Sequence, residues 1–553
     1  MTQTTSSPTL NGIAYFVLPI GRIDLDALRL IFEYIAEADR PNSEHPIADS
    51  WPRLGHVCRV WRSTLLDMPQ LWARDVLAFG TGSALDDVVD RTRELPLRLD
   101  CLSHTLDELS MERIIPLIPR AQALQCELKT YEELKDVLNS IASHPPKALR
   151  TLSISLEMGL NSWFISQSPS YTSCIELLPL RHLEMTGVYP NPPLLGTLTS
   201  WTMKSTDVIL VDPRLPIEVI VNVLAHNTGL ESLCLMDAIS VFRDQNIVLP
   251  DIVVLPKLKS LYIWQESNAS PCPILNRLQL PNPTLEKYWI RDCDVDTAAD
   301  VSAEFASALS ACACSPVLRS GRFLRVQCET RWENKVIVQL HRQYRVPEGP
   351  EHPDNMPFHV EYQPFHLAVS FLELSNAILA PLSRTSLPEQ VLELWWSVFE
   401  EDAQVASYWD TVLQPFQAVT TLIILDVYTH TQAALVAMSA ALTRTRDDGS
   451  LLLPCLNRLV MRAYEMDGLG LFRDHSLLKK RKDMGVPISK VLFLDIDSPN
   501  MNGSEQDDEF DGEVKKQMQD VATELDAGLE SHISWEVVNG QRRIQGTEFV
   551  FKY

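Results

Sequence analysis

The chain has 553 residues, of which 45% are hydrophobic and 22% are charged, and its net charge is −24. This composition is typical of globular proteins and argues against wholesale disorder. The acidic excess argues against binding to nucleic acid or to an anionic membrane surface, since no basic patch is large enough to offset it. We find no signal-peptide pattern and no membrane-spanning apolar stretch, and the eleven cysteines lack framework spacing. We therefore expect reduced thiols and a cytoplasmic or nuclear location, or both.

Two amphipathic helices are predicted close to the N-terminus. In the first, apolar residues follow i, i+3, i+4, i+7 spacing from Leu28, and Asp24 stands at the position of an N-cap. The second helix is predicted from similarly spaced apolar residues between Leu54 and Leu65. A polar, proline-containing loop over residues 39–50 is expected to separate the two helices.

From about residue 80 onward, a short segment of the form Leu-x-x-Leu-x-apolar recurs along the chain. Its copies begin at Leu149, Leu180, Leu198, Leu230, Leu258, Leu285, Val391, Val419, Leu456 and Ile488. The second and third apolar positions lie two residues apart, so they point to the same side of a β-strand. Helical stretches at 217–227 and 405–416 precede two of the copies. Because one such unit cannot bury its own apolar side, we expect stacked units that form an α/β solenoid with a parallel sheet.

These patterns predict the domain organisation. It comprises a disordered tail at 1–12, a small helical domain at 13–79, an irregular repeat solenoid at 80–498, an acidic linker at 499–513 and a C-terminal helix and cap at 514–553. Residues 327–390 contain no clean copy of the repeat and are either an insertion or a break between two halves of the array. The cap is predicted to contain a helix at 514–530, followed by strands in ISWEV and EFVFKY.

Three separated motifs near the N-terminus resemble the F-box. Residues 23–32, IDLDALRLIF, resemble its opening Leu-Pro-x-Glu-Leu-Leu-x-x-Ile-Phe, although Asp24 stands at the position of the proline. Residues 56–62, HVCRVWR, resemble its second motif, Val-Cys-(Arg/Lys)-x-Trp-(Arg/Lys), and Leu71-Trp72 resembles its closing pair. An F-box followed by leucine-rich repeats is similar to the F-box-like proteins that are abundant in mushroom-forming fungi.

This resemblance implies a non-catalytic substrate receptor of a cullin–RING (SCF-type) ubiquitin ligase. The F-box would dock a Skp-type adaptor and through it a cullin, while the repeat solenoid would bind an unknown protein target. The implied adaptor-binding residues are Ile23, Leu25, Leu28, Ile31, Phe32, Ile35, Leu54, Val57, Cys58, Trp61, Arg62, Leu65, Leu71 and Trp72. Trp61 and Trp72 are the expected anchors, because aromatic residues dominate interface hot spots. Arg59 and Arg62 either pair with acidic adaptor residues or form a solvated helix face.

Two other functions stay open at the level of sequence. One is a leucine-rich-repeat scaffold for protein interactions that has a degenerate F-box and no ligase role. The other is an enzyme built on an atypical α/β array, although the sequence contains neither an HExxH nor a Gly-x-Ser-x-Gly motif. We predict no catalytic residues, no metal site, no cofactor and no nucleic-acid or membrane partner.

Overall fold

In the computed structural model, the chain divides into two compact units. The first comprises residues 1–161 and 167–182, and the second comprises residues 162–166 and 183–553. The described residues are 23–41, 50–79, 83–101, 111–156, 178–188, 196–205, 215–240, 252–265, 272–280, 287–295, 298–311, 323–329, 335–341, 358–364, 371–397, 406–427, 432–446, 449–463, 476–494, 527–538 and 541–552, with isolated positions at 175 and between 516 and 523. The predicted tail at 1–12 and the acidic linker at 499–513 lie outside them.

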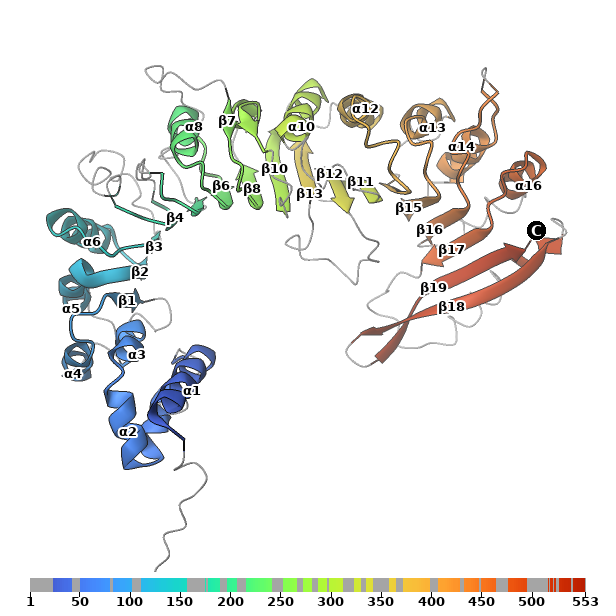
Figure 1. The fold of residues 1–553 in the computed structure, drawn as a ribbon. Helices are drawn as coiled ribbons and strands as arrows, with labels where there is room; N and C mark the ends of the chain where they lie inside the picture. Colours follow the sequence, from blue (N-terminus) through green and yellow to red (C-terminus); the bar gives the residue numbers. More distant parts are fainter. Residues whose placement is uncertain are drawn as a thin grey trace, which may run out of the picture. The chain divides into compact units, whose positions relative to one another are not determined.

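Helices form the N-terminal part of the first unit (Figure 1). They are α1 (Leu25–Ala38), α2 (Arg59–Leu66), α3 (Pro69–Arg74) and α4 (Ser83–Arg91), with the 3-10 turns η3 (Trp51–His56) and η4 (Val76–Phe79). The predicted cap of the first helix is confirmed, because one Asp24 carboxylate oxygen accepts hydrogen bonds of 2.9 Å from the backbone N–H groups of Asp26 and Ala27.

The prediction of one continuous helix between Leu54 and Leu65 is wrong. The turn η3 ends before the chain extends at Cys58, where φ is −160°, and α2 begins only at Arg59. The Cys58 Sγ atom accepts a hydrogen bond of 3.5 Å from the backbone N–H of Trp61 and so caps a new helix at this point. The regular spacing of apolar residues therefore spans two separate elements.

A small parallel sheet completes the first unit. Its strands are β1 (Leu97–Asp100), β2 (Ala121–Leu128) and β3 (Thr151–Leu156), and the segments between them contain α5 (Met111–Ile114), η6 (Ile115–Arg120) and α6 (Tyr131–Ser143). β2 pairs in parallel with both β1 and β3. Thr130 and Glu133 form a capping box that begins α6, and the apolar side of this helix is buried.

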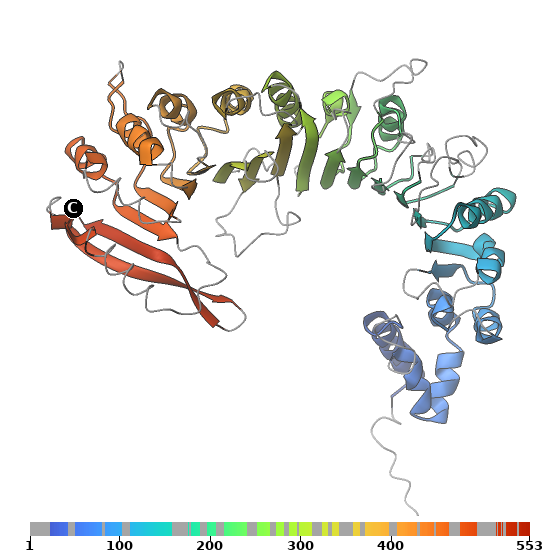
Figure 2. The same cartoon turned by 180° about the vertical axis from the view of Figure 1, so that it is seen from behind.

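The second unit is a mixed α/β structure whose helices lie along one face of a largely parallel sheet (Figures 1 and 2). The strands are β4 (His182–Thr186), β5 (Ser200–Lys204), β6 (Ser232–Met236), β8 (Ser260–Gln265), β10 (Lys287–Val295), β11 (Phe323–Glu329), β12 (Lys335–His341), β13 (Phe358–Pro364), β14 (Glu393–Ser397), β15 (Thr421–Val427), β16 (Arg458–Ala463), β17 (Lys490–Leu494), β18 (Gly528–Val538) and β19 (Gln541–Lys552), and β7 (Val253–Val254) pairs separately with β9 (Leu278–Gln279). The helices are α8 (Ile217–His226), α9 (Cys272–Leu275), α10 (Ala298–Ala311), α12 (Phe371–Leu382), α13 (Ala406–Leu413), α14 (Gln432–Leu442) and α16 (Ser476–Asp483). Among the described helices, none has both the length and the apolar character that crossing a lipid bilayer requires.

A strand occurs at every copy of the recurring sequence segment. Each strand begins two residues after the leading apolar residue of its copy. Wherever its burial is described, that leading residue is at most 1% exposed, as at Leu230 and Val419. On β6, Leu233 and Leu235 are fully buried, while the alternate residues are half-buried. The predicted strand alternation is confirmed, and so are the predicted helices that precede β6 and β15.

The chain reverses direction within residues 327–390, for which the sequence pattern allows an insertion or a break. The strand β12 pairs antiparallel with both β11 and β13. On either side of this trio the pairing is parallel again, β13 with β10 and β11 with β14. The hydrogen-bonded sheet thus passes from β10 through β13, β12 and β11 to β14 without interruption.

The second unit ends in the antiparallel hairpin of β18 and β19, and β19 also pairs antiparallel with β17. The terminal strands predicted in ISWEV and EFVFKY are therefore confirmed. The predicted helix over residues 514–530 extends too far, because β18 already begins at Gly528, where alternating apolar residues favour a strand. The remainder of that predicted helix lies mostly outside the described residues.

Arg481 of α16 is a fully buried cation that no sequence pattern indicated. Its Nη1 atom donates to the carbonyl oxygens of Leu442 at 3.0 Å and Leu452 at 3.1 Å. Its Nη2 and Nε atoms donate to the carbonyl oxygens of Leu453 at 2.8 Å and Val486 at 3.3 Å. Burial lowers the pKa of Arg481 to about 10, so the side chain stays charged at neutral pH. These bonds tie α16 to the end of α14 and to the loop that follows it.

Candidate docking surface on the N-terminal helices

The structure divides the sequence-predicted site residues into three groups. Leu28, Phe32, Leu65, Leu71 and Trp72 are buried, Ile35, Leu54 and Trp61 are half-buried, and Ile23, Leu25, Ile31, Val57, Cys58 and Arg62 are exposed. The buried side chains form the core that supports the helices. The exposed side chains can contact a partner without any rearrangement of the helices.

Four exposed apolar residues escaped the sequence prediction: Leu30, Tyr34, Val60 and Leu66. We define the apolar surface as Ile23, Leu25, Leu30, Ile31, Tyr34, Val57, Val60 and Leu66. These are eight of the twelve large hydrophobic side chains that are exposed in the described part of the chain. The sequence does contain a pattern that indicates two of them. Leu30 and Tyr34 are four residues apart, so they share a second face of α1, separate from the face that carries Leu28 and Phe32.

Aromatic contacts hold the helices beneath the apolar surface. The rings of Phe32 on α1 and Trp61 on α2 meet edge to face with centroids 5.2 Å apart. The rings of Trp72 and Trp51 pack edge to face with centroids 5.1 Å apart. The guanidinium carbon of Arg91 lies 4.9 Å from the centroid of the Trp72 ring. Trp72 is only 4% exposed, so this predicted anchor belongs to the internal core of the helices.

A buried carboxylate joins the elements around α1, and the sequence patterns did not identify it. Asp75 has a side chain that is 5% exposed and accepts a hydrogen bond of 2.9 Å from Trp51 Nε1. Arg40, which follows α1, donates to the same carboxylate through Nη2 at 2.8 Å, and Arg74 donates through Nη2 at 3.1 Å. The Arg74 guanidinium also donates to the carbonyl oxygen of Ala36 in α1. Asp75 therefore fixes the end of α1 against η3 and α3.

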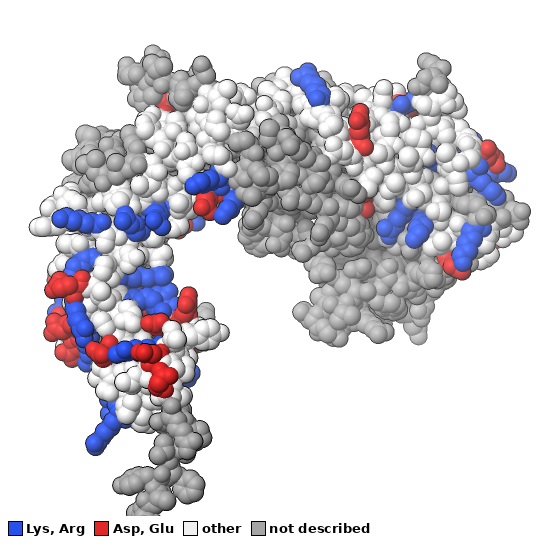
Figure 3. Space-filling view, viewed as in Figure 1, with Lys and Arg blue, Asp and Glu red and all other residues white. Residues whose placement is uncertain are grey.

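The charge around the apolar surface is mixed: α1 carries Asp26, Glu33 and Glu37 against Arg29, whereas η3 and α2 are locally basic. Residues 50–66 contain three arginines and one histidine and no acidic residue, in a chain whose net charge is −24. Arg53 pairs with Asp39 at 3.1 Å, and Arg62 donates through Nε to the carbonyl oxygen of Gly55 at 2.9 Å. Arg59 is exposed and has no partner among the described residues. Figure 3 shows charged side chains of both signs next to uncharged surface in the first unit.

The site contains groups for binding and none arranged for metal chemistry. Within the described ranges, no group of three or more His, Cys, Asp or Glu side chains is placed to hold a metal ion. No protein-family model matches the chain, and no curated protein matches it.

Proposed function

We propose that this chain is a non-catalytic substrate receptor of a cullin–RING ubiquitin ligase. In this proposal residues 13–79 are an F-box that docks a Skp-type adaptor, and the repeats form a solenoid that binds a protein target. The observation that carries the proposal is the concentration of exposed apolar side chains on α1 and α2. So many exposed apolar side chains on two helices that pack together are characteristic of protein-binding surfaces.

The locally basic stretch over η3 and α2 supports acidic groups on the part of the partner that faces these two elements. Arg59 is free to pair with a carboxylate, whereas Arg62 is partly engaged within the chain. Complementary charge at the rim of an interface raises the association rate more than the affinity. An adaptor whose apolar groove is bordered by carboxylates would fit both features.

The second unit supports target binding through the sheet face opposite its helices, which no described helix covers (Figure 2). Side chains at alternate strand positions point to that face. In register across β5, β6 and β8 they include Ser200, Ser232 and Ser260 and, two residues further on, Thr202, Cys234 and Tyr262. Repeat arrays use such extended faces to bind partners, and the strands hold these side chains in fixed positions.

The test is binding of the purified full chain to a purified fungal Skp-type adaptor, measured by calorimetry. The wild type should bind with micromolar affinity or tighter. A variant carrying Leu30→Ser and Tyr34→Ser should bind at least about tenfold more weakly, because it loses exposed apolar contacts without touching the core. The matched control is Val436→Ser on α14, which removes an exposed apolar side chain from the second unit and should bind like the wild type.

Absence of binding by the wild type would overturn the ligase proposal. The chain would then be a repeat scaffold with a degenerate F-box, in which Asp24 replaces the usual proline. Equal binding by the wild type and the Leu30→Ser, Tyr34→Ser variant would place the adaptor contact elsewhere. A thermal melt of each variant separates lost contacts from lost folding.

A further inference from the structure

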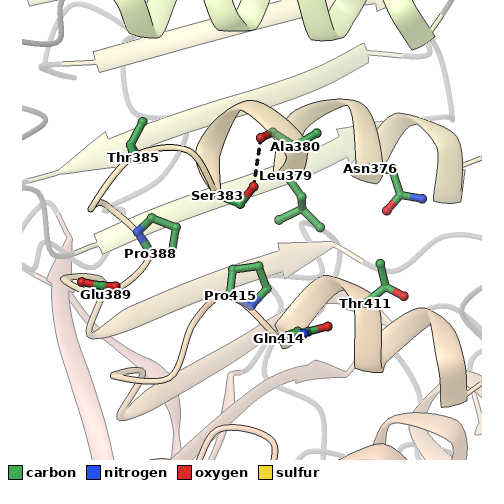
Figure 4. A pocket seen from close by; sticks show the side chains of 10 residues that line it. All are labelled: Asn376, Leu379, Ala380, Ser383, Thr385, Pro388, Glu389, Thr411, Gln414 and Pro415. Atoms are coloured by element: carbon green, nitrogen blue, oxygen red, sulfur yellow. Dashed lines mark hydrogen bonds between the residues drawn. The ribbon is translucent and has the colours of Figure 1, made fainter.

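A surface groove of about 500 Å³ lies between α12 and α13 in the second unit (Figure 4). Glu389 lies at one end, beside the rings of Pro388 and Pro415. Asn376 of α12 lies at the other end, and Leu379 points into the space between. The groove thus combines an apolar floor with a single carboxylate, and none of its lining residues is basic.

The rim that carries Glu389 is held in place by local hydrogen bonds. The Thr385 hydroxyl donates to the carbonyl oxygen of Leu382 at 2.7 Å and accepts from the backbone N–H of Leu387 at 3.2 Å. The backbone N–H of Gln390 then donates to the carbonyl oxygen of Leu387 at 2.9 Å, and the Leu387 side chain is buried. Because this turn is already ordered, a ligand of Glu389 would not have to order it on binding.

The lining side chains offer more hydrogen-bond acceptors than donors. The hydroxyls of Ser383 and Thr411 already donate their hydrogens to backbone carbonyl oxygens, each at 2.9 Å, and keep only lone pairs for a ligand. Within the described part of the chain, the side chains of Glu389, Asn376 and Gln414 have no hydrogen-bond partner. A carboxylate and several oxygen acceptors therefore face a ligand, against only two amide donor groups.

We propose that this groove binds the arginine side chain of a peptide segment in a partner protein. A guanidinium carries five N–H donors in a planar fork and no acceptor, which matches an acceptor-rich site with one carboxylate. Its aliphatic stem would lie along Leu379 and the two proline rings, and its guanidinium would meet the Glu389 carboxylate. The groove lies in a different unit from the apolar surface, so this interaction goes beyond adaptor docking and does not depend on it.

Saturation-transfer NMR on the full chain tests the proposal, with N-acetyl-arginine-N-methylamide as the probe. We expect a dissociation constant of about 1 mM or below, which is reasonable for a single side chain. The neutral isostere N-acetyl-citrulline-N-methylamide should bind at least about tenfold more weakly, because it lacks the charge-assisted hydrogen bonds. Glu389→Gln should weaken the arginine probe by a similar factor. The matched control Glu112→Gln removes an exposed carboxylate from the first unit and should leave binding unchanged.

Three results would overturn the proposal. The first is no saturation transfer from the wild type at a probe concentration of about 10 mM. The second is equal binding of the arginine and citrulline probes, or equal binding by the wild type and Glu389→Gln. The third is tighter binding of agmatine, which has a guanidinium but no peptide bonds, than of the capped arginine, because the site would then favour a small free amine. Glu389 is exposed, so its substitution does not threaten the fold.

Discussion

On α1, Leu30 exposes 66% of its surface and Tyr34 exposes 77%, whereas on β6 Leu233 and Leu235 are fully buried. Both regions are built from closely spaced apolar residues, so the local patterns are similar. The difference lies in their neighbours. Strand β6 has paired strands on both sides and helices over one face, whereas among the described elements α1 packs mainly against α2 and η3 through its buried side. Where neighbouring elements cover apolar residues, these residues form the core. Where they do not, the apolar residues stay exposed and can contact a partner.

Equal truncations in the two regions should have very different effects on folding. Leu233→Ala should lower the free energy of unfolding by about 2–5 kcal/mol, because it leaves a cavity in the core of the sheet. Leu30→Ala should change it by less than about 0.5 kcal/mol, because the side chain is already in water. Urea denaturation of the two variants and the wild type measures both quantities. Similar losses in the two variants would show that α1 is covered in solution.

The buried Asp75 carboxylate should matter more than an exposed ion pair in the same unit. Asp75→Ala should cost about 2 kcal/mol, because it leaves Trp51 Nε1 and two arginines without their acceptor. Asp86→Ala breaks the exposed pair with Arg113 and should cost less than about 1 kcal/mol. Urea denaturation of the two variants measures both losses. If both substitutions have the same small effect, the contacts of Asp75 do not stabilise the packing of α1 against η3 and α3.

The cysteines provide a third and smaller contrast. Cys58, at the start of α2, and Cys455 are exposed, whereas burial raises the pKa of Cys101 to about 12 and that of Cys234 to about 11. Among the five cysteines that the structure describes, we therefore expect a thiol reagent at pH 8 to modify Cys58 and Cys455 before Cys101, Cys126 and Cys234, as measured by peptide mass spectrometry. Rapid labelling of Cys101 would mean that the sheet of the first unit opens readily.

These raised pKa values also give the direction of a pH effect on stability. In the unfolded chain the thiols titrate near 9.0, whereas in the folded protein Cys101 and Cys234 keep their protons to higher pH. The folded state thus binds more protons above pH 9, and the free energy of unfolding should fall as the pH rises beyond that point. Replacing both cysteines with alanine should reduce this slope.

The elements that the sequence predicted correctly depend on contacts close together in the chain. The Asp24 cap involves residues two and three positions away, and each strand at a copy of the repeat is marked by the spacing within a six-residue segment. Such patterns report local geometry directly. The break at Cys58 was missed because the same apolar spacing fits one helix or two, and a thiol is a weak sign of an N-cap.

By itself, the sequence determined the strands at the copies of the repeat, two of the helices that precede them and the position of the helical segment that carries the candidate site. Only the tertiary structure decided which of the predicted site residues are exposed, because burial depends on neighbours that are distant in the chain. It placed Trp72 against Trp51 inside the core and left Leu30 and Tyr34 in water. It also brought Arg40 to Asp75 over 35 positions, and Arg481 to the carbonyl oxygen of Leu442 over 39. No local spacing encodes these pairs, since they form only when separate elements pack together.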